Sequence, residues 1–119
     1  LKGGHFMTKF IPDCYWPEVD NGSYVSHEAV CVLNTNTASA TVNLTFFFED
    51  RPKMEGFSIT VPGERTTHIR LDKLQNADGP AIPRGVPYAL MIESDLEVSL
   101  QYTRVDTTQP ELAITTTIV

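Results

Sequence analysis

The segment Ser26-His27-Glu28 places a hydroxyl, an imidazole and a carboxylate next to one another. It lies in a predicted strand, where successive side chains point to opposite faces, so His27 faces away from Ser26 and Glu28. These groups therefore form no local catalytic triad, and the sequence contains no Gly-x-Ser-x-Gly motif. Two interpretations of Glu28 stay open: it pairs with an arginine such as Arg70 or Arg104, or it belongs to a functional site.

Two of the histidines, His27 and His68, could approach each other in a sheet. Together with Asp13 or Glu28 they would offer the imidazole and carboxylate ligands that zinc and iron accept. The sequence has no His-x-His or His-Glu-x-x-His spacing, which would set two ligands on one face. We therefore predict no metal site, no cofactor and no catalytic residue.

Three arginines, Arg65, Arg70 and Arg104, fall in predicted strands. Guanidinium groups favour carboxylates, phosphates and pairs of sugar hydroxyls, so these residues form either an internal ion-pair network or a ligand site. Arg104 and Asp106 share one face of their strand. Trp16 either stacks on the apolar face of a sugar ring or plugs the core or an interface.

The elements that position these residues are predicted to be strands. Apolar residues recur at every second position in short segments separated by Gly, Pro, Asn and Asp, a pattern typical of an all-β sandwich or barrel. In segment 40–49, four apolar residues share one face and are predicted to be core: Val42, Leu44, Phe46 and Phe48. We expect about seven strands in a single-domain antiparallel β-sandwich, jelly-roll-like in architecture.

Short polar connections predict three hairpins in this sandwich. They join 24–33 with 40–49, 57–61 with 65–71, and 88–94 with 98–105, and 112–119 forms the last strand. The connection 72–87 is predicted to be long and irregular, with one helical turn at 72–75. Exposed sheet edges invite pairing with another copy, which favours a homo-oligomer.

The chain has 119 residues, with 9 Lys or Arg against 15 Asp or Glu, so its formal net charge is −6. This length fits one domain over residues 1–119, and the acidity disfavours nucleic acid and anionic lipid as partners. No apolar run approaches the roughly 20 residues that span a bilayer, and no secretory signal is evident, so we expect a cytoplasmic protein. Cys14 and Cys31 are expected to be reduced, and residues 1–7 to be a mobile or non-native end.

Several short blocks resemble, in their order along the chain, the Anabaena sensory rhodopsin transducer family. The resemblance runs from about Phe10 almost to the C-terminus. The blocks are Ile11-Pro12-Asp13-Cys14-Tyr15, Ser26-His27-Glu28, Val30-Cys31-Val32-Leu33-Asn34, Val61-Pro62, Arg65-Thr66-Thr67-His68-Ile69-Arg70, Ile82-Pro83 and Gln101-Tyr102-Thr103-Arg104-Val105-Asp106.

The resemblance implies a compact all-β sandwich that assembles as a homotetramer in the cytoplasm. The member that names the family docks on the cytoplasmic face of a membrane photoreceptor, whereas many relatives are viewed as binding domains for sugars or related polar metabolites. Carried over by position, the resemblance implies a candidate ligand shell, to which Trp16 is added as a stacking residue: His27, Glu28, Arg65, His68, Arg70, Gln101, Arg104 and Asp106.

We therefore predict a non-enzymatic cytoplasmic module that binds a sugar or related polar metabolite and transmits the binding event to a partner. One alternative is a protein-interaction transducer that docks on a membrane photoreceptor. Another is a small sugar isomerase or lactonase that uses Glu28 and a histidine as acid and base, which requires both groups to reach one substrate.

Overall fold

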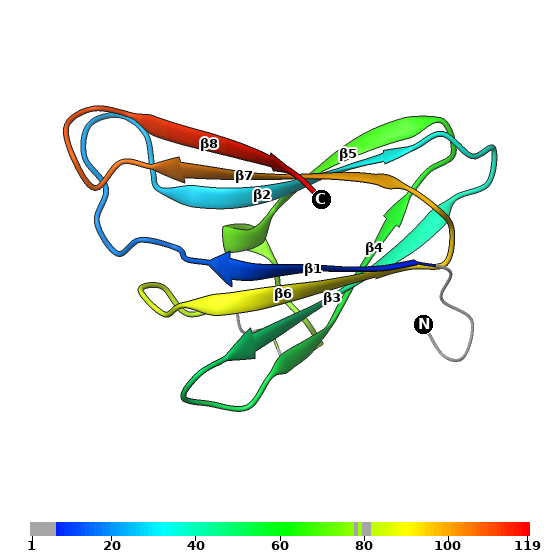
Figure 1. Ribbon diagram of the computed structural model, residues 1–119, viewed down its shortest axis with the longest axis horizontal. Helices are drawn as coiled ribbons and strands as arrows, with labels where there is room; N and C mark the ends of the chain where they lie inside the picture. The colour runs from blue at the N-terminus through cyan, green and yellow to red at the C-terminus, as the bar shows by residue number, and fades with distance from the viewer. Residues whose placement is uncertain (1–6, 78, 80–81) are drawn as a thin grey trace.

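The computed structural model describes residues 7–77, 79 and 82–119. Two antiparallel four-stranded sheets face each other, one with the order β1-β6-β3-β4 and the other with the order β5-β2-β7-β8 (Figure 1). We call them sheet A and sheet B. The predicted all-β antiparallel sandwich is confirmed. The strands are β1 (Met7–Cys14), β2 (His27–Asn34), β3 (Ala40–Phe48), β4 (Met54–Val61), β5 (Arg65–Arg70), β6 (Tyr88–Ser94), β7 (Ser99–Asp106) and β8 (Ala113–Ile118), with a short 3-10 helix, η1 (Leu71–Lys73).

The core lies between the sheets and is built by the period-two pattern. Along β3, Val42, Leu44 and Phe46 are buried and Phe48 is half-buried, as the alternation predicts. Phe46 packs edge-on against Phe57 of β4, with ring centroids 5.0 Å apart. Sheet B contributes its own alternating set to the same core.

All three predicted hairpins are wrong, because each pair of segments belongs to different sheets. β2 pairs with β5 and β7, β3 with β4 and β6, and no ladder joins β2 to β3, β4 to β5 or β6 to β7. The three short connections therefore cross from one sheet to the other. The hairpins in the described residues are β3–β4 and β7–β8.

The sequence analysis also missed one strand, β1, which pairs antiparallel with β6. Residues 1–6 of the end that was expected to be mobile lie outside the described residues, and Met7 already belongs to β1. The predicted helical turn at 72–75 is the 3-10 helix Leu71–Lys73, which begins one residue earlier. Among the described residues, no helix is long and apolar enough to cross a membrane.

Candidate functional site

Sheet B presents the predicted site residues on two opposite faces. Because side chains alternate along β2, His27, Cys31 and Leu33 face outward, and Glu28 faces the core with Val30 and Val32. The register of β2 with β5 and β7 extends each face across three strands. The candidate shell is thus divided by the sheet into an inner and an outer group.

The inner group surrounds Glu28, a carboxylate that is only 1% exposed. Its oxygens accept hydrogen bonds from the Tyr88 hydroxyl (2.5 Å), from the Tyr102 hydroxyl and from the Tyr15 backbone N–H (2.8 Å). Tyr88 belongs to sheet A and Tyr102 to sheet B, so this one carboxylate joins the two sheets. Such donors are what a buried carboxylate requires.

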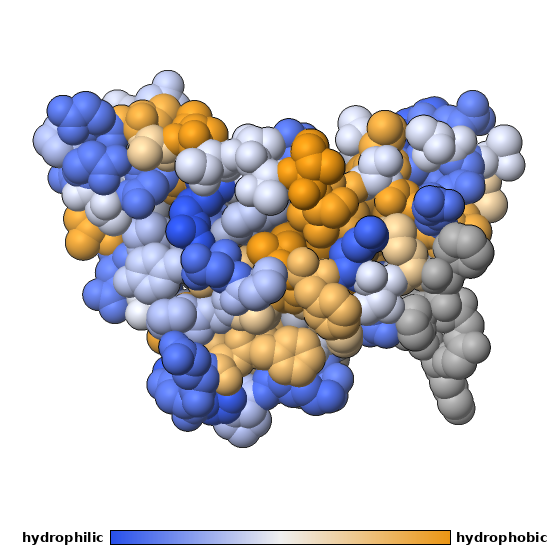
Figure 2. All heavy atoms as spheres, in the orientation of Figure 1, coloured by the Kyte–Doolittle hydropathy of each residue, from blue (hydrophilic) through white to orange (hydrophobic). Residues whose placement is uncertain are grey.

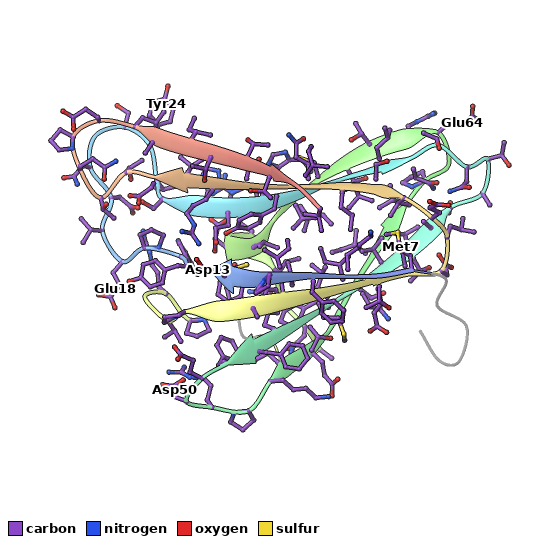
Figure 3. The ribbon with its side chains drawn as sticks, in the orientation of Figure 1. Met7, Asp13, Glu18, Tyr24, Asp50 and Glu64 are labelled. Atoms are coloured by element: carbon purple, nitrogen blue, oxygen red, sulfur yellow. The ribbon has the colours of Figure 1, made fainter. Side chains whose placement is uncertain are left out.

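Arg104 supplies the positive charge beside this carboxylate. Its Nε lies 3.6 Å from Oε2 of Glu28, which confirms one of the two interpretations of Glu28, pairing with an arginine. The same Nε is buried and has no hydrogen-bond partner among the described residues. A terminal nitrogen of Arg104 donates to the carbonyl oxygen of Asp13 at 3.4 Å, and Figure 3 shows Asp13 at the end of β1, on the side that faces sheet B.

Burial and the negative charge of Glu28 keep the neighbouring acids protonated. Burial, followed by the charge of Glu28, raises the pKa values of the Tyr88 and Tyr102 hydroxyls above the ordinary tyrosine value. The same two causes raise the pKa of the buried Cys14 thiol to about 12. Both tyrosines therefore act as hydrogen-bond donors at neutral pH, and Cys14 is no nucleophile.

The outer group forms a row across three strands. The sheet register places Cys31 opposite His68 of β5 on one side and opposite Gln101 of β7 on the other. The Cys31 Sγ and His68 Nδ1 atoms are 3.1 Å apart. Arg70 lies in the next row and makes two hydrogen bonds to the Asp72 carboxylate, at 2.8 and 2.7 Å.

A hollow of about 310 Å³ lies beside this row. Its polar wall includes Gln101, Ser99 and Thr66, and its apolar wall includes Leu33 and Ile118. The Gln101 side-chain amide, which can both donate and accept hydrogen bonds, lines this hollow. A mixed wall of this kind is typical of small-molecule sites.

The hydrogen bonds of the remaining predicted residues are made to other partners. His27 Nδ1 is 2.9 Å from the carbonyl oxygen of Val25, Arg65 is exposed at the start of β5, and Asp106 accepts hydrogen bonds from Thr108. The hydrogen bonds from Thr108 hold the pKa of Asp106 below its ordinary value. The structure therefore brings together His68, Arg70 and Gln101 on one face, and Glu28 with Arg104 on the other.

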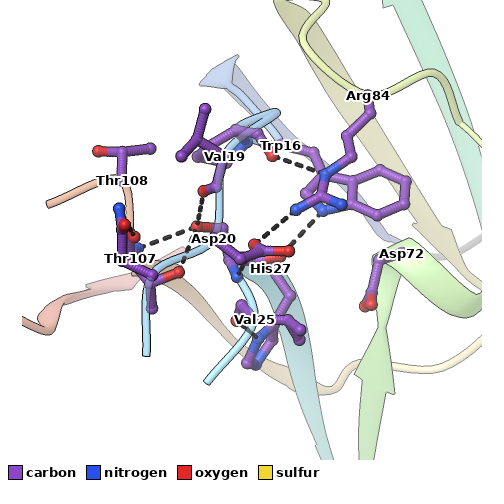
Figure 4. A network of polar contacts seen from close by, with 12 residues as sticks. Trp16, Val19, Asp20, Val25, His27, Asp72, Arg84, Thr107 and Thr108 are labelled. Atoms are coloured by element: carbon purple, nitrogen blue, oxygen red, sulfur yellow. Dashed lines mark hydrogen bonds and ion pairs between the residues drawn. The ribbon is translucent and has the colours of Figure 1, made fainter. Parts of the chain in front are cut away.

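Trp16 belongs to a separate network around the loop before β2 (Figure 4). Its indole N–H donates to the carbonyl oxygen of Ser26, and the Arg84 guanidinium lies 5.0 Å from its ring centroid. Arg84 also pairs with Asp20 at 2.5 Å, and that hydrogen bond holds the pKa of Asp20 below its ordinary value. One face of the indole is thus covered by a cation, as expected of an internal anchor.

A cleft of about 300 Å³ at the end of sheet A was missed by the sequence analysis. Asp13, Phe48, Glu49 and Tyr88 are among the residues that line it, and Tyr88 connects it to Glu28. The Ile-Pro-Asp block drew attention to Asp13, but the sequence did not show which residues line the cleft with it, because they are distant in sequence. Among the residues described, no cluster of three or more His, Cys, Asp or Glu side chains could hold a metal ion.

The fold and its buried charge cluster define a class of protein: a two-sheet antiparallel β-sandwich whose sheets are joined through one carboxylate. The chain belongs to the Anabaena sensory rhodopsin transducer family, whose model matches residues 5–119. It is similar to the solved structure of Thermotoga maritima 1070, with 34% identity, a TM-score of 0.82, and coverage of 99% of this chain and 94% of that one.

It is also similar to the solved structure named Anabaena sensory rhodopsin transducer. There the identity is 33%, the TM-score is 0.73, and the match covers 87% of this chain and 90% of that one. No curated protein matches the sequence. Both structural similarities extend over most of each chain, so the sandwich and its site regions fall within the shared fold.

Proposed function

We propose that this chain is a non-enzymatic, single-domain binding module whose ligand is a sugar or related polar metabolite, bound on the outer face of sheet B. The observation that carries the proposal is the row formed by His68, Cys31 and Gln101 beside the hollow of about 310 Å³. Three strands contribute to the row, so a rigid sheet positions the side chains.

The chemistry of this face suits a ligand with several hydroxyl groups. The Gln101 amide can both donate and accept, and Arg70 keeps N–H donors beyond the two that bind Asp72. β5 and β7 are separated by two strand spacings, about 10 Å, which a sugar with its substituents can span. Leu33 and Ile118 offer apolar contact to the less polar ring face.

The inner group supports binding rather than catalysis. Glu28 lies on the opposite face of sheet B from both His27 and His68, an arrangement that disfavours the pairing of Glu28 with one of these histidines in the enzyme alternative. Glu28 is also enclosed by three donors and is only 1% exposed. In this proposal Glu28 and Arg104 fix β2 and β7 beneath the binding face.

A thermal-shift screen tests the proposal. The purified protein is heated with sugars, sugar acids, sugar phosphates and nucleotides, and a ligand at 100 times its dissociation constant stabilises it by about 2.7 kcal/mol. We expect a saturable shift with one class that Gln101→Ala and Arg70→Ala each weaken. Lys53→Ala, on the β3–β4 connection, is the matched control. A ligand whose affinity both site variants leave intact would refute this location.

The structural similarity to the Anabaena sensory rhodopsin transducer favours a second candidate function. In this reading, a cytoplasmic homotetramer of the chain docks on the cytoplasmic face of a membrane photoreceptor. The test is co-sedimentation with proteoliposomes that carry a sensory rhodopsin, compared with protein-free liposomes of the same lipids. Saturable binding to the first alone supports docking, and equal binding to both removes it.

A further inference from the structure

Cys31 and His68 form a pair of a nucleophile and a base on the outer face of sheet B. Cys31 of β2 stands directly opposite His68 of β5, and its Sγ atom lies 3.1 Å from Nδ1 of the imidazole. Cys31 is a free, partly exposed cysteine and His68 is exposed, so dissolved molecules reach both groups. When a thiol at this distance passes its proton to an imidazole, it becomes a thiolate, the nucleophilic form of cysteine.

Few charged groups face this pair. On β5 the neighbouring outward residue is Arg70, whose guanidinium makes two hydrogen bonds to Asp72. On β7 the residue opposite the thiol is Gln101, which does not titrate, and on β2 the nearest outward titratable group is His27. The outward positions of the four strands of sheet B hold no Asp or Glu. The imidazole of the pair is therefore the base that takes the thiol proton.

The thiol opens onto the hollow of about 310 Å³ on this face, which Cys31 lines together with Leu33, Ser99 and Ile118. Figure 2 shows hydrophobic surface around the position where β8 ends in Figure 1, and this end of β8 contributes Ile118 to the hollow. The hollow gives room for a small group attached to the sulfur, with polar and apolar walls to contact it.

The other cysteine of the chain does not serve as a disulfide partner for Cys31. The chain has two cysteines, and Cys14 is fully buried in the core between the sheets, whereas Cys31 faces outward. Burial, followed by the charge of Glu28, raises the pKa of the Cys14 thiol to about 12. A sulfur that bonds to Cys31 therefore comes from a molecule in solution.

We propose that Cys31 is a site of reversible modification by small disulfides, at which His68 accepts the thiol proton and the hollow holds the attached group. Cys31 passes its proton to His68, and its sulfur attacks one sulfur of a disulfide RSSR. A new S–S bond joins Cys31 to one RS group while the original S–S bond breaks. The leaving RS thiolate takes the proton from His68 and departs as RSH. A free small thiol reverses the exchange by the same steps.

The attached group has a consequence for ligand binding. His68, Cys31 and Gln101 form the row on which the proposed ligand lies, so an RS group on Cys31 occupies the space of that ligand. This consequence rests on the proposed function, whereas the exchange at Cys31 does not. Modification by small disulfides would thus switch binding off, and reduction would restore it.

Intact-mass spectrometry after incubation with glutathione disulfide tests which thiol reacts. We expect one glutathione adduct on the folded protein, none on folded Cys31→Ser, and two on protein unfolded in urea, where Cys14 is also accessible. An unmodified Cys31 in the folded protein, under conditions in which the unfolded protein takes up both adducts, would overturn the proposal.

The role of His68 is tested by the rate of exchange with a nitrobenzoate disulfide, whose released thiol is coloured. We expect His68→Gln to slow the reaction of Cys31 about tenfold or more near pH 7. The difference should shrink above about pH 9, where a thiol ionises without a base. His27→Gln, which removes the other imidazole of this face, is the matched control, and thermal unfolding checks that each variant is folded. Equal rates of the wild type and His68→Gln at every pH would overturn the part assigned to His68.

The part assigned to the hollow has its own variant. Ser99→Tyr fills the hollow with a ring and leaves the Cys31–His68 pair in place, so we expect it to slow exchange with glutathione disulfide several-fold. Val105→Tyr adds the same ring at an outward position of β7 that does not line the hollow, and is the control. If the two variants react at the same rate, the hollow does not hold the attached group.

Ligand binding is measured separately from exchange. A ligand found in the thermal-shift screen should lose affinity for protein that carries the glutathione adduct and regain it after reduction. A screen without a ligand removes the proposed function, but the mass and rate measurements use no ligand and still decide the reactivity of Cys31. Slow exchange in the wild type together with a ligand that binds would overturn this inference and leave the proposed function standing.

Discussion

A fully buried carboxylate is costly unless donors surround it, and Glu28 has the hydroxyls of Tyr88 and Tyr102 and a backbone N–H around it. We predict that Glu28→Gln lowers the free energy of unfolding by about 2–4 kcal/mol, because the amide nitrogen would face these donors and Arg104 would lose its counter-charge. Urea unfolding measures the change. The exposed Glu97→Gln is the control and should stay within about 0.5 kcal/mol of the wild type.

The raised pKa values around Glu28 predict a loss of stability at alkaline pH. Unfolded Cys14 ionises near its ordinary value of 9.0, and unfolded Tyr88 near 10.0, whereas both stay protonated in the folded state. Because the folded-state pKa values are raised, the stability that these protonated groups contribute is fully present below about pH 9 and is lost as the pH rises. Each group contributes a slope approaching about 1.4 kcal/mol per pH unit.

Unfolding free energies measured from pH 7 to pH 11 test this dependence. Tyr88→Phe should remove the contribution of one proton to the slope of unfolding free energy against pH. The control Tyr24→Phe, at an exposed position, should leave the slope unchanged. A stability curve that is flat up to pH 11 would contradict the protonated state assigned to the cluster.

The residue types of this cluster were predictable only in part. A carboxylate and an arginine on the same inward face, Glu28 and Arg104, follow from alternation along two strands. The hydrogen bond from Tyr88 to Glu28 could not be predicted, because it depends on how the two sheets pack against each other. Likewise, His68 and Arg104 were predicted to share a ligand shell. The strand register and the alternation of side chains along β5 and β7 instead place them on opposite faces of sheet B.

At the scale of elements, the strands were predictable and their partners were not. Asn34-Thr35-Asn36-Thr37 has the composition of a hairpin turn, yet here it carries the chain from sheet B to sheet A. Turn-forming residues permit a reversal in either geometry, so composition alone cannot distinguish a hairpin from a crossing connection. The buried Asn34 is specific to the crossing geometry. Its side-chain amide donates to the carbonyl oxygens of Ala38, Val61 and Pro62, and so links the β2–β3 connection to the β4–β5 connection.

Gly63 belongs to the same junction of crossing connections. A Cβ atom on Gly63 would lie 2.1 Å from the carbonyl oxygen of Thr37. This distance is too short for two non-bonded atoms, and the neighbouring atoms are backbone atoms rather than the end of a flexible side chain. We predict that Gly63→Ala destabilises the protein by about 2–3 kcal/mol in urea unfolding. Gly22→Ala is the comparison, because Gly22 has a left-handed φ of 76° but open space around its Cα, and it should cost about 1 kcal/mol. A Gly63→Ala cost no larger than that of Gly22→Ala would disprove the close approach.

At the scale of the whole molecule, sheet B ends in an open edge while its opposite edge is charged. In a free copy, the amides of Thr115 and Thr117 are protected by β7, and those of Ile114 and Ile118 are exposed to solvent. Hydrogen exchange followed by NMR is therefore expected to show an alternating pattern of protection along β8.

The amides of Thr115 and Thr117, which bond to β7, serve as the internal reference for this pattern, because their protection depends on the sandwich alone. We expect the amides of Ile114 and Ile118 to exchange faster than those of Thr115 and Thr117 in dilute protein. Equal exchange of the two sets would contradict the direction assigned here to the backbone groups of β8.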